Sequence, residues 1–163
     1  MAKKKDKPDH RVIENRRAHF DYDIGETVEC GMQLFGSEVK SVRAGLVSLG
    51  EGYVRADASP PSLWLHGVNI ALYGPAGSIG GSSRQAEPTR TRKLLAHKNE
   101  ILKLWKAQQI KGNTLVPLKL YFKNGYAKCL IGVGTGRKRG DKREAIKTRE
   151  MKRDIDRAMT KRK

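Results

Sequence analysis

The chain has 163 residues, which suits one domain with a terminal extension, and its formal net charge of +17 favours a polyanionic partner, above all a nucleic acid. Two cysteines, Cys30 and Cys129, with no CxxC pair exclude a disulfide framework and a zinc knuckle. No apolar run reaches the length of a membrane-spanning helix or a secretory signal, so we expect a soluble, cytoplasmic protein without a membrane partner.

Apolar residues alternate with polar ones in several short segments, which is the period of a half-buried strand. Two strands are predicted at 19–24 and 28–34, and a short helix from Ser37, as N-cap, to Arg43, with Gly45 ending it. Further strands are predicted at 52–56, 63–66, 115–122 and 126–133. Asn124-Gly125 between the last two is a strong signal for a tight hairpin.

One segment has helical spacing instead. From Thr89 to about Lys111, apolar residues recur at intervals of three, four and seven, with Thr89 as the expected N-cap and Gly112 as the terminator. Short strands with one short and one long helix indicate a mainly β fold with helices, a small antiparallel OB-like barrel. The glycine-rich loop 74–83 has nothing to pack and is expected to be mobile.

Charge divides the chain into a flexible basic N-terminus (1–14), the barrel (15–136) and a basic tail (137–163). The tail holds 13 basic and 5 acidic side chains, a net of +8. Helical spacing runs from Asp141 to Met159, but its apolar stripe is too narrow to offset a backbone entropy cost of roughly 1 to 2 kcal/mol per residue. We therefore expect a tail that is disordered when free and helical on RNA.

Catalytic and metal-binding patterns are weak in this sequence. Asp21 and Asp23 are predicted to share one face of a strand, as in a metal-dependent nuclease, although solvent-facing strand acids are far commoner. The histidines lack metal-ligand spacing, and residues 132–140 match neither phosphate-loop motif. Both cysteines lie in strand patterns and are interpreted as buried hydrophobes. A binding protein without metal or cofactor is therefore favoured over an enzyme.

Basic groups recur along the chain and could follow a phosphate backbone. They are Asn15-Arg16-Arg17, Lys40 with Arg43, Arg90 with Arg92 and Lys93, and the run that begins at Arg137. On composition alone they indicate an RNA or DNA binder without identifying the molecule.

Five motifs follow one another along the chain: NRRAHFDY (15–22), GSEVKSVRAG (36–45), RTRKLL (90–95), PLKLYFKNG (117–125), and GRK (136–138) followed by DKR (141–143). In this order they resemble the SmpB family, the SsrA-binding proteins of bacteria. The resemblance covers about residues 11–160. It implies an oligonucleotide-binding barrel that grips the tRNA-like domain of transfer-messenger RNA.

The resemblance also implies a non-enzymatic adaptor for trans-translation and ribosome rescue. In the family, the protein and its RNA enter stalled ribosomes with elongation factor Tu and GTP, and the tail folds in the decoding centre and along the empty message channel. The implied partners are thus transfer-messenger RNA, the ribosome with its small-subunit rRNA, and elongation factor Tu through the RNA complex. A monomer is expected.

Matching positions imply RNA contacts in the barrel. Asn15 is expected to pair with a base edge and Arg17 to hold phosphate, while Glu29 and Glu38 would accept from exocyclic base amines. The remaining contacts are Arg16, Lys40, Ser41, Arg43, Arg90, Arg92, Lys93, Leu95 and Lys128. Lys40, Ser41 and Arg43 are placed on the short helix, and Arg92, Lys93 and Leu95 at the start of the longer one. Core packing is the alternative role of Leu95.

Matching positions in the tail imply ribosome contacts, which are Gly136, Arg137, Lys138, Arg139, Asp141, Lys142, Arg143, Lys147, Arg149, Lys152, Arg153, Ile155 and Met159. Two positions depart from the family pattern. Thr135 stands where Lys is frequent, and Gly140 stands where many members carry His or an aromatic residue. Stacking on an rRNA base is therefore not expected at Gly140, and rRNA binding there is expected to depend on Arg139 instead.

Two other functions remain open at this point. A basic ribosomal protein with an rRNA-ordered tail would bind mature subunits and would not favour transfer-messenger RNA over tRNA. A metal-dependent nuclease using Asp21 and Asp23 would cleave RNA in the presence of magnesium.

Overall fold

The computed structural model describes residues 12–74, 87–137 and 139–160. The helices and strands of the first part are β1 (Ile13–Glu14), α1 (Arg16–Asp21), β2 (Tyr22–Met32), α2 (Gly36–Arg43) and β3 (Val47–Ser48). Those that follow are β4 (Tyr53–Ala58), β5 (Pro61–His66), β6 (Asn69–Ile70), β7 (Arg92–Leu95), α3 (Lys98–Gln109), β8 (Asn113–Lys123), β9 (Tyr126–Gly136) and α4 (Arg139–Thr160). Most of the predicted loop 74–83 lies outside the described residues.

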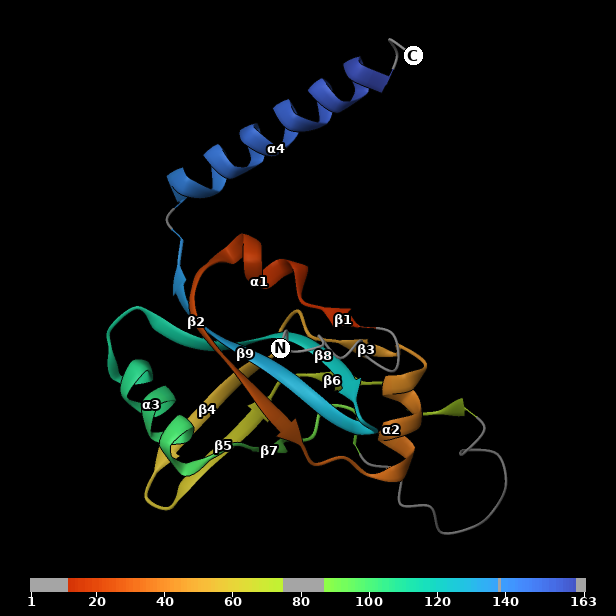
Figure 1. Ribbon diagram of the computed structural model, residues 1–163, viewed down its shortest axis with the longest axis vertical. Helices are drawn as coiled ribbons and strands as arrows, with labels where there is room; N and C mark the ends of the chain where they lie inside the picture. Colours follow the sequence, from red (N-terminus) through yellow and green to blue (C-terminus); the bar gives the residue numbers. More distant parts are fainter. Residues whose placement is uncertain (1–11, 75–86, 138, 161–163) are drawn as a thin grey trace, which may run out of the picture.

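The main sheet is antiparallel and runs in the order β1-β8-β4-β5-β7-β2-β9. Because β9 pairs with both β2 and β8, the sheet closes into a barrel, with β2, β8 and β9 crossing its centre in Figure 1. β3 and β6 form a separate short pair. The predicted mainly β, OB-like barrel with helices is confirmed.

Alternating inward side chains fill the barrel. Leu63, Leu65, Leu120, Phe122 and Ile131 are each at most 1% exposed. Burying a side chain of this size contributes about 1.5 to 3 kcal/mol. The predicted hairpin is confirmed as well, because the two residues of the turn between β8 and β9 both have positive φ, 52° and 76°.

The strand predicted at 19–24 is wrong in its first half, where the chain forms α1. The side chain of Asn15 caps this helix, its amide oxygen accepting from the Ala18 N–H at 3.0 Å. The strand then begins at Tyr22 and continues to Met32, so the two predicted strands are one, with an irregular register between Ile24 and Thr27.

The long helix is shorter than predicted. Residues 92–95 form β7, which pairs with both β2 and β5, and α3 begins at Lys98 after His97 as N-cap, not after Thr89. Arg92 and Leu94 face inward while Lys93 and Leu95 are exposed, which is the alternation of a strand. Tertiary pairing thus overrides the helical spacing that the apolar residues suggested.

Three smaller differences concern helix and segment ends. Phe35, not Ser37, is the N-cap of α2, and its N–H donates to the Glu38 carboxylate at 2.8 Å. Gly45 ends the helix with φ of 77°, as predicted. Ile13 and Glu14, assigned to the flexible N-terminus, pair with β8.

The helical spacing over 141–159 corresponds to α4, and the expectation that this segment is disordered in the free chain stays a prediction. Figure 1 shows α4 rising away from the barrel beyond α1. Its apolar residues remain at the surface, with Ile146 42%, Met151 66%, Ile155 52% and Met159 70% exposed.

Candidate nucleic-acid interface

A buried ion-pair network joins α2 to the strand β7. Glu38, 5% exposed, accepts hydrogen bonds from Arg90 at 2.9 and 2.5 Å and from Arg92 Nε at 2.9 Å. Arg92 is fully buried, and it also donates to the carbonyls of Val68 at 2.8 Å, Pro88 at 2.8 Å and Arg90 at 3.0 Å. These contacts hold α2 and the segment before β7 in one arrangement.

The network gives a structural role to two of the predicted RNA-contact residues, Glu38 and Arg92. Burial raises the pKa of Glu38, but the hydrogen bonds from Arg90 and from the Phe35 N–H, with the charge of Arg92, outweigh it and leave the pKa below its ordinary value. The carboxylate is therefore ionised and already satisfied by protein donors. Glu38 and Arg92 therefore have a structural role within the protein, and their expected RNA contacts stay predictions.

Asn15 also has a structural role that differs from the predicted one. It is 4% exposed, and its Nδ2 donates to the carbonyls of Leu49 at 3.0 Å and Pro117 at 2.9 Å. Since its oxygen caps α1, both ends of the amide are used within the protein. Asn15 fixes α1 on the barrel, and its expected pairing with a base edge stays a prediction.

Glu29, Leu95 and Lys128 meet in a groove, which we call the Glu29 groove. Its volume is about 530 Å³, and its lining residues are Glu29, Gly31, Leu95, Ala96, His97, Glu100 and Lys128. The Nζ of Lys128 lies 3.9 Å from the Glu29 carboxylate, and Leu95 is 53% exposed. A partly exposed carboxylate beside an apolar surface can accept from a base amine while the base packs on the leucine.

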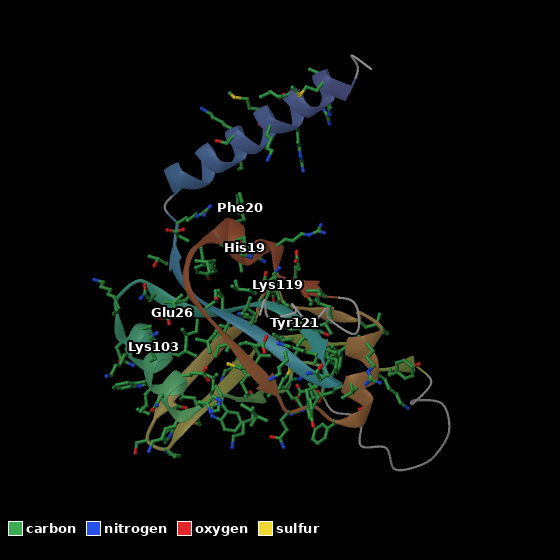
Figure 2. All side chains as sticks on the ribbon, in the orientation of Figure 1. His19, Phe20, Glu26, Lys103, Lys119 and Tyr121 are labelled. Atoms are coloured by element: carbon green, nitrogen blue, oxygen red, sulfur yellow. The ribbon has the colours of Figure 1, made fainter. Side chains whose placement is uncertain are left out.

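Tyr121, which is labelled in Figure 2, is a residue of this region that the sequence analysis missed. Its hydroxyl donates to the Glu29 carboxylate, and burial together with this hydrogen bond raises the pKa of Tyr121. Tyr121 is also the cross-strand partner of Lys128. The Asn124-Gly125 turn sets this register, so the hairpin signal could have brought Tyr121 to Lys128.

Within residues 12–74 and 87–137, four basic side chains lie over aromatic rings. Arg90 is 4.2 Å from the ring centroid of Phe35, Arg43 5.2 Å from Phe122, Lys40 5.8 Å from Tyr73 and Lys93 5.9 Å from Trp64. Such contacts orient a cation while leaving it in water. Lys40, Arg43 and Lys93 are exposed and can reach phosphates as predicted, whereas Arg90 is largely occupied by Glu38.

Ser41 does not have the accessibility that an RNA contact needs. It is 1% exposed, and its hydroxyl has no hydrogen-bond partner within the described part of the chain. Ser41 lies among the buried residues of α2, and its predicted RNA contact stays a prediction.

Arg16 and Arg17 lie on α1 and are both exposed. Arg17 Nε donates to the Asp21 carboxylate at 3.2 Å, one helical turn away. Asp21 ends this helix and Asp23 lies in β2, so the prediction that the two acids share a strand face is wrong. Among the described residues, no group of three or more His, Cys, Asp or Glu side chains could hold a metal ion.

The two cysteines are paired in register but not in a disulfide. Cys30 and Cys129 are directly opposite each other in the β2–β9 ladder, fully buried and free. Burial raises the pKa of Cys30 to about 12 and also raises that of Cys129. Both thiols are therefore protonated, and the interpretation as small buried hydrophobes is confirmed.

The junction between barrel and tail is tied to β2 and α1. Gly136 is the register partner of Tyr22 at the end of β9. The Arg137 N–H donates to the Asp21 carbonyl at 3.0 Å, and its guanidinium lies 3.8 Å from the Asp23 carboxylate. Arg137 therefore belongs to the barrel surface as much as to the tail.

The other predicted ribosome contacts are distributed along α4. Lys138 lies outside the described residues, and only the backbone positions of Arg139, Asp141, Lys142, Arg143 and Arg149 on the helix are described. Lys147, Lys152, Arg153, Ile155 and Met159 are exposed. None of the described helices is both long enough and apolar enough to cross a membrane.

Comparison with known proteins identifies relatives of the whole chain. The family model "SmpB protein" matches residues 12–161. An SsrA-binding protein of Exiguobacterium sp. is 46% identical over 159 residues, 98% of this chain and 96% of the relative. One from Levilactobacillus brevis is 47% identical over 161 residues, 98% of each chain. A chain of the solved structure "tmRNA-SmpB: a journey to the center of the bacterial ribosome" is 45% identical, with a TM-score of 0.63 over 83% of this chain and 94% of that one.

Proposed function

The chain belongs to the SmpB family, and from this premise we propose that it binds transfer-messenger RNA through the barrel and carries it to stalled ribosomes, where α4 contacts small-subunit rRNA. The observation that carries the proposal is the family match over residues 12–161, which includes both the barrel and the tail helix. The protein acts in trans-translation as an adaptor and makes no covalent bond itself. It works in the cytoplasm, as a monomer, with elongation factor Tu and GTP joining through the RNA complex.

The barrel binds by two kinds of contact. The exposed Lys40, Arg43 and Lys93 neutralise phosphates and supply most of the salt-dependent affinity. Glu29 supplies specificity, because its carboxylate repels phosphate but can accept a hydrogen bond from the exocyclic amine of a base. The Tyr121 hydroxyl and Lys128 hold the carboxylate of Glu29 in place.

The tail binds by charge and has little internal stability. A helix with exposed apolar residues and a high density of cations is favoured where rRNA phosphates surround it. Arg137 fixes the point where this helix leaves the barrel, so that the RNA bound by the barrel and the rRNA contacted by α4 are held in one geometry.

A gel-shift comparison tests the function. The proposal predicts that the full chain binds transfer-messenger RNA more tightly than tRNA at moderate salt, and that it shifts transfer-messenger RNA without cleaving it during long incubation with magnesium. Equal affinity for both RNAs, with stoichiometric binding to mature subunits, would instead identify a ribosomal protein. Cleavage abolished by Asp21→Asn would identify a nuclease.

A further inference from the structure

The outer surface of β4, β5 and β7 carries aromatic and basic side chains that the proposed function does not use as a unit. The antiparallel register places Tyr53 opposite His66, and Trp64 between Arg55 and Lys93. The neighbours along each strand, such as Val54, Leu63 and Leu94, face inward and are buried. We call Tyr53, Arg55, Trp64, His66 and Lys93 the aromatic face.

Contacts within the aromatic face hold its rings in defined positions. The rings of Tyr53 and His66 are stacked, with centroids 5.1 Å apart and an interplanar angle of 12°. Thr91 Oγ1 lies 3.2 Å from His66 Nδ1. The Trp64 Nε1 donates to the Ser62 hydroxyl at 3.3 Å, and Lys93 lies over the Trp64 ring. The rings are thus ordered before any partner arrives, which lowers the entropy cost of binding.

The aromatic face is accessible as well as ordered. Tyr53 is 50% exposed, and the side chain of Arg55 is 67% exposed. Tyr53 also borders a hollow of about 530 Å³ whose lining includes Arg17, Glu51 and Thr114. This volume is in the range of pockets that hold small ligands, so the ring has room beside it for a nucleotide.

Charge indicates which partner fits. Arg55 and Lys93 lie on either side of Trp64, and the Asp57 carboxylate lies 3.5 Å from the Arg55 Nε. An apolar protein partner would have to desolvate both cations, whereas phosphates on either side of a stacked base complement them. Ordered aromatic rings alternating with cations are the arrangement that binds single-stranded nucleic acid without sequence preference.

We propose that the aromatic face is a binding site for unpaired RNA nucleotides, distinct from the Glu29 groove. One base stacks on the free side of Tyr53 and another on Trp64, with phosphates at Arg55 and Lys93. The groove and the face are neighbours, because β7 presents Leu95 to the first and Lys93 to the second. The site requires only single-stranded RNA and does not depend on recognition of a tRNA-like domain.

Tryptophan fluorescence provides a direct test in the full chain. The sequence has two tryptophans, Trp64 and Trp105, so Trp105→Phe leaves Trp64 as the sole reporter. Titration with a single-stranded RNA hexamer of mixed sequence at low salt should quench this fluorescence to saturation. Tyr53→Ala in the same background should weaken the apparent affinity about tenfold, as expected for the loss of one stacked base. Arg55→Gln, a conservative second variant, should weaken it several-fold.

Tyr126→Ala is the matched control, because Tyr126 is also an exposed tyrosine, 73% exposed against 50% for Tyr53, and it lies on the β8–β9 hairpin. It should leave hexamer binding unchanged, and the thermal midpoint of each variant establishes that it is folded. Glu29→Ala should also leave hexamer quenching unchanged while it weakens transfer-messenger RNA binding, which separates this proposal from the proposed function. Absence of saturable quenching, or equal weakening by Tyr126→Ala and Tyr53→Ala, would overturn the proposal.

Discussion

The barrel and the tail helix contain the same kinds of charged residue but use them in opposite ways. In the barrel, Arg92 is completely buried and each of its contacts is to a carboxylate or carbonyl of the protein. On α4, Lys147, Lys152 and Arg153 are exposed, and Ile155 and Met159 are exposed beside them. The buried charge of Arg92 thus has all its hydrogen-bond partners within the barrel, whereas the described side chains of α4, both charged and apolar, are exposed.

This contrast separates stability from binding. A substitution in the buried barrel network should change the free energy of unfolding, one at the barrel surface should change RNA affinity, and one on the apolar side of α4 should change neither in the absence of the ribosome. The following predictions test this separation from the largest effect to the smallest.

Glu38→Ala should lower the free energy of unfolding by about 3 to 5 kcal/mol, because it leaves Arg92 as an uncompensated buried charge. Urea denaturation measures this change. Glu26→Ala, which removes the exposed partner of Lys103, is the matched control and should cost about 0.2 to 1 kcal/mol. Similar losses in the two variants would contradict the structural role of Glu38.

The same network predicts a response to acid. Because the pKa of Glu38 is lower in the folded chain than in the unfolded chain, ionised Glu38 stabilises the fold above the unfolded pKa, and this stabilisation is lost as the pH falls through the folded pKa. Urea midpoints measured from pH 6 down to pH 2 should therefore fall more steeply for the native chain than for Glu38→Gln. Parallel curves would show that the carboxylate contributes nothing to this dependence.

Asn15→Ala should lower the free energy of unfolding by about 2 to 4 kcal/mol, because it removes the cap of α1 and leaves two buried carbonyls without donors. The affinity of the folded fraction for transfer-messenger RNA should change little. A large loss of affinity with unchanged stability would restore the role of Asn15 in reading a base.

Glu29→Ala should weaken binding of transfer-messenger RNA by about 1 to 3 kcal/mol, because the groove loses its acceptor for base amines. Filter binding at fixed salt measures the effect. Glu26→Ala, on the same strand, should leave the affinity unchanged. If Glu29→Ala strengthens binding, as removal of a simple negative charge would, the specificity role is refuted.

Ile155→Ala should change the free energy of unfolding by less than about 0.5 kcal/mol, since Ile155 is 52% exposed and packs on little of the chain. Tagging of stalled ribosomes should nevertheless fall, because α4 loses apolar contact surface there. Unchanged tagging would show that charge alone places the helix.

Local signals predicted the fold where they agreed with the tertiary pairing. The Asn124-Gly125 turn identified the β8–β9 hairpin, and alternation identified β4 and β5 to within a few residues. α1 and β7 were missed because each depends on partners that are distant in the sequence. Asn15 donates hydrogen bonds to the carbonyls of Leu49 and Pro117, and β7 lies between β2 and β5. Neither kind of partner leaves a mark in the local pattern.

Several residues of the candidate site were predictable from the sequence, but their burial was not. Resemblance pointed to Glu29, Leu95 and Lys128, and the structure places all three in one groove. Resemblance could not separate them from Glu38, Arg92 and Ser41, because an acid or a base looks the same in sequence whether it faces solvent or a buried partner. The aromatic face could not be predicted from the sequence, because its residues become neighbours only when β4, β5 and β7 pair in this register.

Hydrogen exchange of the full chain, free and bound to ribosomes with transfer-messenger RNA, tests the division between barrel and tail most directly. In the free chain, amides of β8 and β9 should be strongly protected, while amides of residues 139–160 should exchange nearly as fast as in an unfolded peptide. Ribosome binding should then protect the tail. Protection of α4 in the free chain comparable to that of β9 would contradict the account.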